Sequence, residues 1–218
     1  MMINAYWPEF LSLALIHFMA VVAPGPDFVV TVRQSLKFGR THGVMTALGI
    51  GFGLGIHVLY TLLGVSALMH TSEWLLTAAK VLGAIYLVYL GVQLCRSKPA
   101  KHNESATATN TEEHPDTPIE SQSLKRAFSI GFLTNATNPK ATLFFLAVMT
   151  NVVSIDTPMT VQMFYGAWMC SVNALWFTLV SLVFSAEKAR CWFQRQMHLI
   201  ERSLGVVLIA FAARLAFV

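Results

Sequence analysis

Six apolar stretches, each long enough to cross a bilayer as a helix, dominate this sequence of 218 residues. A helical span needs about 20 mostly apolar residues. Hydrophobic residues make up 55% of the chain and charged residues only 12%, which is too apolar a balance for a soluble surface. The sequence therefore predicts an all-α integral membrane protein. Its expected spans are 9–32, 43–69, 74–95, 127–150, 158–185 and 197–217.

Lysine and arginine are spread unevenly over the connections between these spans. The first, third and fifth connections carry positive charge, whereas the second and fourth carry no Lys or Arg. Because cytoplasmic loops are enriched in these residues, we expect the odd-numbered connections in the cytoplasm and both termini in the periplasm. This topology accounts for the net charge of +4, so the basic excess points to the lipid bilayer and not to a nucleic-acid partner.

The third connection differs in composition from the rest of the chain. Residues 98–126 contain few large apolar side chains, which predicts a disordered cytoplasmic linker. The linker separates a transmembrane repeat at 1–97 from a second repeat at 127–218, with three spans in each. Because three is an odd number, the second repeat starts from the opposite side of the membrane, and the two repeats are inverted. A regulatory role of the linker stays open beside that of a simple tether.

Each repeat opens with a span that is broken by proline and carries a charge. The breaks read Pro24-Gly25-Pro26-Asp27 and Asn138-Pro139-Lys140. Interrupted spans in corresponding positions of two halves are the best sequence indication of a transporter site at the bilayer midplane. A charged residue at the centre of a span raises the free energy of membrane insertion by about 2.5–3.5 kcal/mol. An acid and a base there therefore indicate a water-filled cavity or a charged substrate. The alternative is that Asp27 caps its half-helix and pairs with Lys140 only to join the halves.

Four other side chains within the spans are polar or aromatic and could serve the same site. Asn173 and Trp176 lie nearly one turn apart, so they are expected on one face as cavity wall, with simple packing as the equal alternative. His57 and His17 are candidates for carrying protons, although a hydrogen-bonded core histidine is the commoner role.

In the second span, glycine pairs at small-xxx-small spacing predict close helix packing; they are Gly49/Gly53 and Gly51/Gly55.

No motif for metal binding or catalysis occurs in the sequence. The three cysteines form no CxxC pair, and no HExxH helix, phosphate loop or Ser-His-Asp set is present. We therefore expect no metal, no cofactor and no enzymatic activity.

The segments around the two breaks resemble the LysE/RhtB family of bacterial amino-acid exporters, in particular its threonine and homoserine or homoserine-lactone efflux branch. The likeness runs nearly end to end and is carried by residues 23–27, 82–91 and 131–141. The resemblance implies a six-span carrier of the bacterial inner membrane that exports small amino acids by using the proton gradient. The predicted substrate-binding residues are Pro24, Gly25, Pro26, Asp27, Asn135, Asn138, Pro139, Lys140, Asn173 and Trp176.

A zwitterionic amino acid matches the opposite charges of the two breaks. We expect Asp27 to bind the ammonium group, and Lys140 with the backbone N–H groups beyond Pro139 to bind the carboxylate, in an alternating-access exporter. Protonation of Asp27 from outside would displace the ammonium and couple transport to protons, with His57 as the second candidate. A metal-ion exporter of the same fold and a non-transport accessory subunit are the alternatives. Whether the protein forms a homo-oligomer stays open.

Overall fold

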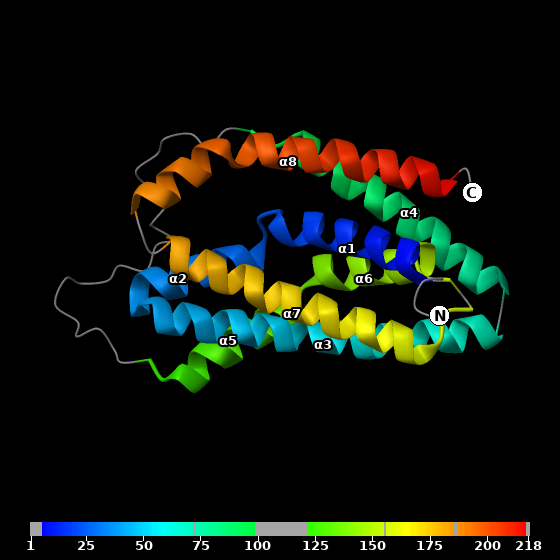
Figure 1. Ribbon diagram of the computed structural model, residues 1–218, viewed down its shortest axis with the longest axis horizontal. Coiled ribbons are helices and arrows are strands. Elements are labelled where there is room, and N and C mark those ends of the chain that lie inside the picture. The colour runs from blue at the N-terminus through cyan, green and yellow to red at the C-terminus, as the bar shows by residue number, and fades with distance from the viewer. Residues whose placement is uncertain (1–5, 72, 99–121, 155, 185–186, 217–218) are drawn as a thin grey trace.

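Helices form the whole architecture of the described chain. A computed structural model describes residues 6–71, 73–98, 122–154, 156–184 and 187–216, and no strand occurs among them. The helices run mostly along one long axis (Figure 1), which confirms the all-α prediction. They are α1 (Trp7–Val22), α2 (Pro26–Phe38), α3 (Arg40–Thr71), α4 (Glu73–Cys95), α5 (Leu124–Ala136), α6 (Pro139–Asn151), α7 (Met159–Phe184) and α8 (Glu187–Ala216).

Both predicted helix breaks occur at proline. Pro26 is the first residue of α2, and Pro139 is the first residue of α6. Proline lacks the N–H that a helix interior needs, but its fixed φ suits the first helical position. The axes of α1 and α2 differ by 53° across the first break. The predicted helix interruptions at Pro26 and Pro139 are therefore confirmed.

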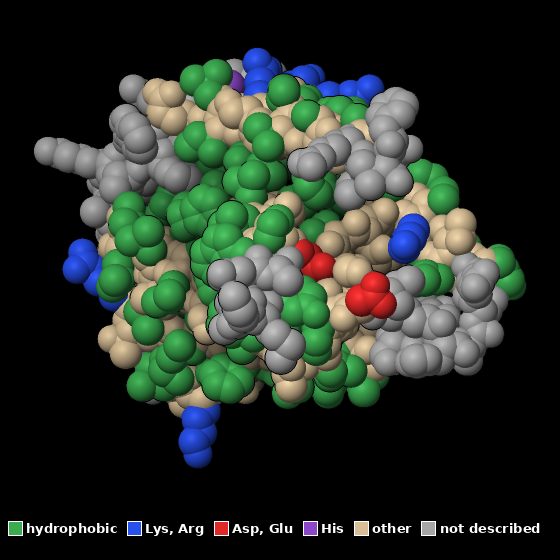
Figure 2. Space-filling model, turned by 45° about the vertical axis from the view of Figure 1, so that its right-hand side comes forward, with side chains coloured by type: hydrophobic (Ala, Val, Ile, Leu, Met, Phe, Trp, Pro, Cys, Tyr) green, Lys and Arg blue, Asp and Glu red, His purple; other side chains and the backbone are tan. Residues whose placement is uncertain are grey.

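Long helices with exposed apolar side chains on their outer faces characterise the described part of the chain. Four of its helices, α3, α4, α7 and α8, are long and apolar enough to cross a membrane, and the bent α1–α2 pair makes a fifth candidate. Large apolar side chains on their outer faces are exposed, such as Phe52 at 67% and Leu175 at 69%. Figure 2 shows one face that is covered largely by hydrophobic side chains, with Lys and Arg near its edges. Such a surface suits contact with lipid rather than water.

Several helices extend beyond the predicted spans: α2 ends at Phe38 instead of 32, α3 begins at Arg40 instead of 43, and α5 and α8 also begin earlier. α8 begins at Glu187 instead of 197, whereas its membrane-crossing part is Gln196–Ala213. Hydropathy locates only the part of a helix that lies in lipid, and the backbone can continue as helix into water. α5 begins at Leu124, where the Ser123 hydroxyl accepts a bond from the Arg126 N–H at 3.2 Å. The helix therefore includes the end of the predicted 98–126 linker; residues 99–121 of that linker lie outside the described residues.

Glycines bring α3 into close contact with two neighbouring helices. A Cβ on Gly53 would lie 2.7 Å from the Phe132 carbonyl oxygen of α5, and one on Gly51 would lie 2.7 Å from Cβ of Ala174 on α7. Such distances are too short for any larger side chain, so the packing role of these glycines is confirmed. Gly55 is a correction, because a Cβ there would meet nothing within 4 Å.

Two helices that precede the 98–126 segment pack against two that follow it. α3 contacts α7, and α4 contacts α8. The start of α1 and the end of α8 lie at the same end of the molecule (Figure 1). The breaks before α2 and α6 face one another in the interior, and this is where the candidate site lies.

Candidate functional site

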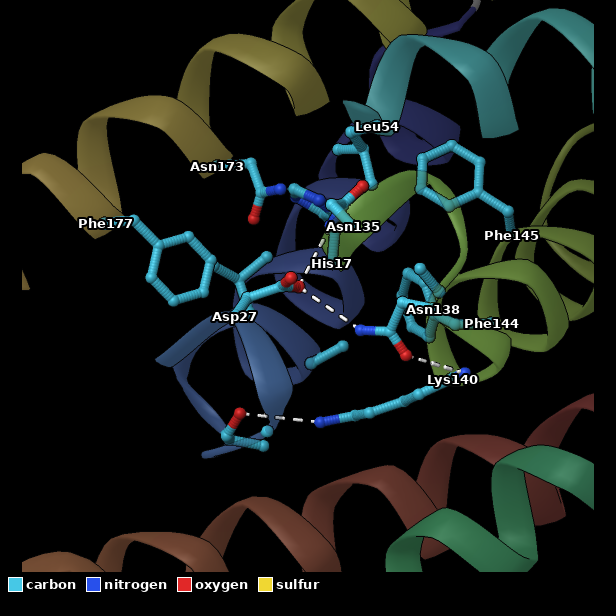
Figure 3. Close-up of a pocket in the computed structure, with 15 residues that line it drawn as sticks. His17, Asp27, Leu54, Asn135, Asn138, Lys140, Phe144, Phe145, Asn173 and Phe177 are labelled. Carbon is cyan, nitrogen blue, oxygen red and sulfur yellow. Dashed lines mark hydrogen bonds between the residues drawn. The ribbon is translucent and has the colours of Figure 1, made fainter. Parts of the chain in front are cut away.

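A cavity lies between the two helix breaks (Figure 3). It offers about 50 Å³ to the centres of water-sized molecules, which is room for about three to five waters. Side chains from α1, α2, α3, α5, α6 and α7 line it. The predicted binding residues among them are Gly25, Asp27, Asn135, Asn138, Lys140 and Asn173.

The Asp27 carboxylate is held by two amides from the opposite break. Asn135 Nδ2 donates to Asp27 Oδ2 at 2.9 Å, and Asn138 Nδ2 donates to the same oxygen at 3.3 Å. The other oxygen, Oδ1, is buried and has no hydrogen-bond partner within the described residues. Among the described residues the Asp27 carboxylate makes no hydrogen bond to the backbone of α2, although Asp27 lies in the first turn of that helix. One carboxylate oxygen is thus fixed, and the other remains available to a ligand.

Lys140 reaches the first break from the second. Its Nζ donates to the carbonyl oxygen of Ala23, the residue that follows α1, at 3.4 Å. Its backbone N–H donates to Asn138 Oδ1 at 3.0 Å, so Asn138 caps α6. Within the described residues, the bonds of Asp27 and Lys140 run to amide and carbonyl groups rather than to each other. The acid and the base therefore share one cavity without a direct ion pair.

His57 lies behind the second break and does not line the cavity. It is fully buried, its Nε2 lies 2.8 Å from the Asn135 carbonyl oxygen, and its Nδ1 lies 2.6 Å from the Tyr60 hydroxyl. Because a carbonyl only accepts, Nε2 donates in this contact and Nδ1 accepts from Tyr60 in a neutral ring. His57 thus donates to a carbonyl near the end of α5. Its contacts lead to Asp27 through Asn135 and also, by way of Thr142, through Asn138.

α7 presents a different aromatic residue to the cavity than the sequence predicted. Asn173 lines the cavity, but Trp176 does not, and its ring packs edge-on against Phe18 at 5.8 Å. Phe177 lines the cavity in its place. At 3.6 residues per turn, residues four apart are offset by about 40° around the helix and residues three apart by about 60°, so Phe177 lies closer than Trp176 to the face of Asn173. That spacing was the signal that could have identified Phe177.

Several other cavity residues were not among the predicted substrate-binding residues, although His17 was named as a candidate for carrying protons. His17 of α1 lines the cavity together with Phe144 and Phe145 of α6. A histidine inside an apolar run was a visible signal, but nothing in the sequence shows which face of α1 points inward. Pro24, Pro26 and Pro139 are not lining residues, and the last two set the starts of α2 and α6.

No cluster for a metal ion is found in the described part of the chain. No three His, Cys, Asp or Glu side chains gather there in a position to hold one.

Comparisons with known proteins identify the family. A family model described as LysE type translocator matches residues 18–217. The chain is 30% identical over 206 residues to the threonine efflux protein of Escherichia coli (strain K12), covering 94% of this chain and 96% of the relative. It is 29% identical over 207 residues to an uncharacterized membrane protein of Haemophilus influenzae, covering 95% of each. No solved structure shows a significant match.

These relatives match the chain along almost its whole length. The region that the family model matches contains both helix breaks and every cavity-lining residue except His17. The expected character of the protein, a multi-pass membrane transporter and not an enzyme, agrees with the family. The chain belongs to the LysE family of translocators.

Proposed function

We propose that the protein exports small zwitterionic amino acids, such as threonine or homoserine, from the cytoplasm across the bacterial inner membrane. The observation that carries this proposal is the pair of opposite charges, Asp27 and Lys140, in one partly enclosed cavity without a direct bond between them. An amino acid supplies the matching ammonium and carboxylate. The similarity to a protein named for threonine efflux supports the same class of substrate.

In the proposed complex, the substrate ammonium donates to Asp27 Oδ1, the oxygen that has no partner among the described residues. The substrate carboxylate binds Lys140 Nζ in exchange for the long 3.4 Å bond to Ala23. Hydrogen bonds to charged groups stabilise by about 1.5–3 kcal/mol each, enough to orient a small solute. The Lys140 N–H already donates to the Asn138 cap. Of the backbone N–H groups beyond Pro139, that of Ala141, which lines the cavity, is therefore the one expected to bind the substrate carboxylate.

The proposed topology has six spans in two inverted repeats, with both termini in the periplasm. The α1–α2 pair forms the first span and the α5–α6 pair forms the fourth. The contacts of α3 with α7 and of α4 with α8 support a two-fold relation between the halves. The common location of the start of α1 and the end of α8 agrees with an even number of crossings (Figure 1).

Alternating access requires a closure at the end of the molecule where the termini lie. Glu9 of α1 accepts bonds there from the Ser154 N–H at 2.9 Å and from the Thr157 hydroxyl at 3.0 Å. The Tyr165 hydroxyl donates to the carbonyl oxygen of Tyr6 at 3.1 Å. These bonds join the start of α1 to the α6–α7 connection and to α7. In our proposal they close the periplasmic side and break when substrate is released outside.

Proton antiport would follow from competition between a proton and the substrate ammonium for Asp27. A proton that enters from the periplasm neutralises the carboxylate and releases the ammonium, and loss of that proton to the cytoplasm restores the site. His57 is the second candidate for this step, because it contacts Asn135, which in turn donates to Asp27.

Homoserine and homoserine lactone form a matched pair of substrates for the test. The lactone keeps the ammonium but has no carboxylate. In inverted membrane vesicles, Lys140→Met is expected to lower homoserine uptake about tenfold or more and lactone uptake much less, a difference of about 1.4 kcal/mol or more. Asp27→Asn is expected to lower both. Wild-type rates for both substrates in both variants, at normal membrane levels, would contradict the assignment of the site.

Thermal stabilisation of the purified protein separates the alternative functions, because a ligand that binds only the folded state raises its melting temperature. Stabilisation by amino acids is expected. Stabilisation by divalent metal ions alone would support a metal-ion exporter, and stabilisation by neither would support an accessory subunit.

A further inference from the structure

His17 lies at the edge of the cavity with both of its ring nitrogens unpaired. The side chain is only 1% exposed, and neither Nδ1 nor Nε2 has a hydrogen-bond partner within the described residues. The rings of Trp168, Phe144 and Phe145 surround the imidazole at centroid distances of 5.9, 6.2 and 6.5 Å. Leaving a buried polar group unpaired is unfavourable, so two unpaired nitrogens that border a cavity indicate a ligand.

A second unpaired atom belongs to a neighbouring residue of the same cavity. Asn135 uses its Nδ2 for Asp27, but its Oδ1 is buried without a partner among the described residues. Asn173 adds an amide from α7 to the cavity lining. Figure 3 shows His17, Asn135 and Asn173 on one side of Asp27 and Lys140 on the other. The cavity therefore has a polar end that the charges of the substrate backbone do not use.

The order of these groups assigns each part of a bound amino acid to a different residue. With the carboxylate at Lys140 and the ammonium at Asp27, the substrate side chain extends toward His17. A neutral imidazole offers one donor and one acceptor nitrogen, and the Asn135 Oδ1 offers a further acceptor. A hydroxyl group both donates and accepts, so it can satisfy His17 and Asn135 together. The aromatic rings around His17 leave an apolar environment for a methyl or methylene group.

We propose that His17 is a specificity-determining residue, which binds the side-chain hydroxyl of the substrate and makes the protein selective for small hydroxy amino acids. This inference rests on the proposed export function. A site that hydrogen-bonds a substrate hydroxyl discriminates strongly against an analogue without it, because the buried polar groups of the site are then left unpaired. Valine is such an analogue of threonine, since it has nearly the same shape and a methyl group in place of the hydroxyl.

The test compares initial uptake of threonine and valine into inverted vesicles that contain the full-length protein. Wild type is expected to prefer threonine by at least about tenfold. His17→Leu is expected to bring the ratio of the two rates close to one, and His17→Gln, which keeps a donor and an acceptor, to retain part of the preference. Thr61→Val is the matched control, because Thr61 is also buried with an unpaired hydroxyl but does not line the cavity. It is expected to leave the ratio unchanged.

Other roles of His17 predict different outcomes. A purely structural histidine would lower both rates equally in His17→Leu and keep the ratio at its wild-type value, and so would a proton carrier; either result would overturn the proposal. If His17→Leu does not reach the membrane, the ratio in His17→Gln and thermal stabilisation of wild type by threonine against valine decide the question. Equal stabilisation of wild type by both would also overturn it. Failure of the export function itself would differ, because wild type would then transport neither amino acid.

Discussion

Asn135 and Asp27 are separated by 108 positions in the sequence and joined by a 2.9 Å hydrogen bond from Nδ2 to Oδ2. The bond links the end of α5 to the first turn of α2, and so it connects the two helix breaks. It also decides which carboxylate oxygen stays available, because Oδ1 has no partner among the described residues. The same residue pair thus stabilises the breaks and orients the proposed ammonium site.

Asn135→Leu is expected to weaken both the fold and export. The change removes the 2.9 Å bond to a partly buried carboxylate, which corresponds to about 1.5–3 kcal/mol. We expect a lower melting temperature in detergent and a clear loss of homoserine export. Thr134→Val is the control, since within the described residues the Thr134 hydroxyl bonds only to the Ile130 carbonyl of the same helix, at 2.7 Å. Equal behaviour of the two variants would argue against a special role of the Asn135 amide.

His57→Leu tests whether this histidine positions the second break or carries protons. Loss of the bond to the Asn135 carbonyl is expected to reduce stability by about 1–3 kcal/mol. We expect slower export with an unchanged dependence on the pH gradient, measured in vesicles with imposed gradients. Export that proceeds without any response to the gradient would instead identify His57 as the proton carrier.

Glu9→Gln is expected to loosen the periplasmic closure. The substitution removes the charge that accepts bonds from Ser154 and Thr157, and it leaves only one acceptor oxygen. A cysteine introduced at Ala20 in the cavity should then react faster with a membrane-impermeant maleimide added from the periplasmic side. Asp156→Asn removes a nearby exposed acid and serves as the control. Unchanged labelling in Glu9→Gln would mean that these bonds do not hold the closure.

Gly53→Ala is expected to destabilise the protein through the contact of α3 with α5. The new Cβ would lie 2.7 Å from the Phe132 carbonyl oxygen, so the helices must move apart, at a cost of about 1–3 kcal/mol. Gly55→Ala offers a matched control two residues away, where a Cβ meets nothing within 4 Å. There the higher helix propensity of alanine is expected to leave stability unchanged or slightly improved. The measurement is the melting temperature of both variants in the same detergent.

The sequence by itself determined the features of the fold that depend on local chemistry. Runs of apolar residues predicted where the helices lie, and proline predicted both breaks, because each effect acts within a few residues of the chain. The charges Asp27 and Lys140 predicted the candidate site, since a charge within an apolar span is unfavourable unless the surroundings compensate for it.

Only the tertiary structure decided which face of each helix meets the cavity. Asn173 and Phe177 point there while Trp176 packs against Phe18, and His17 borders the cavity while His57 turns to the Asn135 carbonyl. The helical period fixes the angle between two side chains but not the rotation of the helix as a whole. That rotation depends on contacts between helices far apart in the sequence, such as those that Gly51 and Gly53 allow.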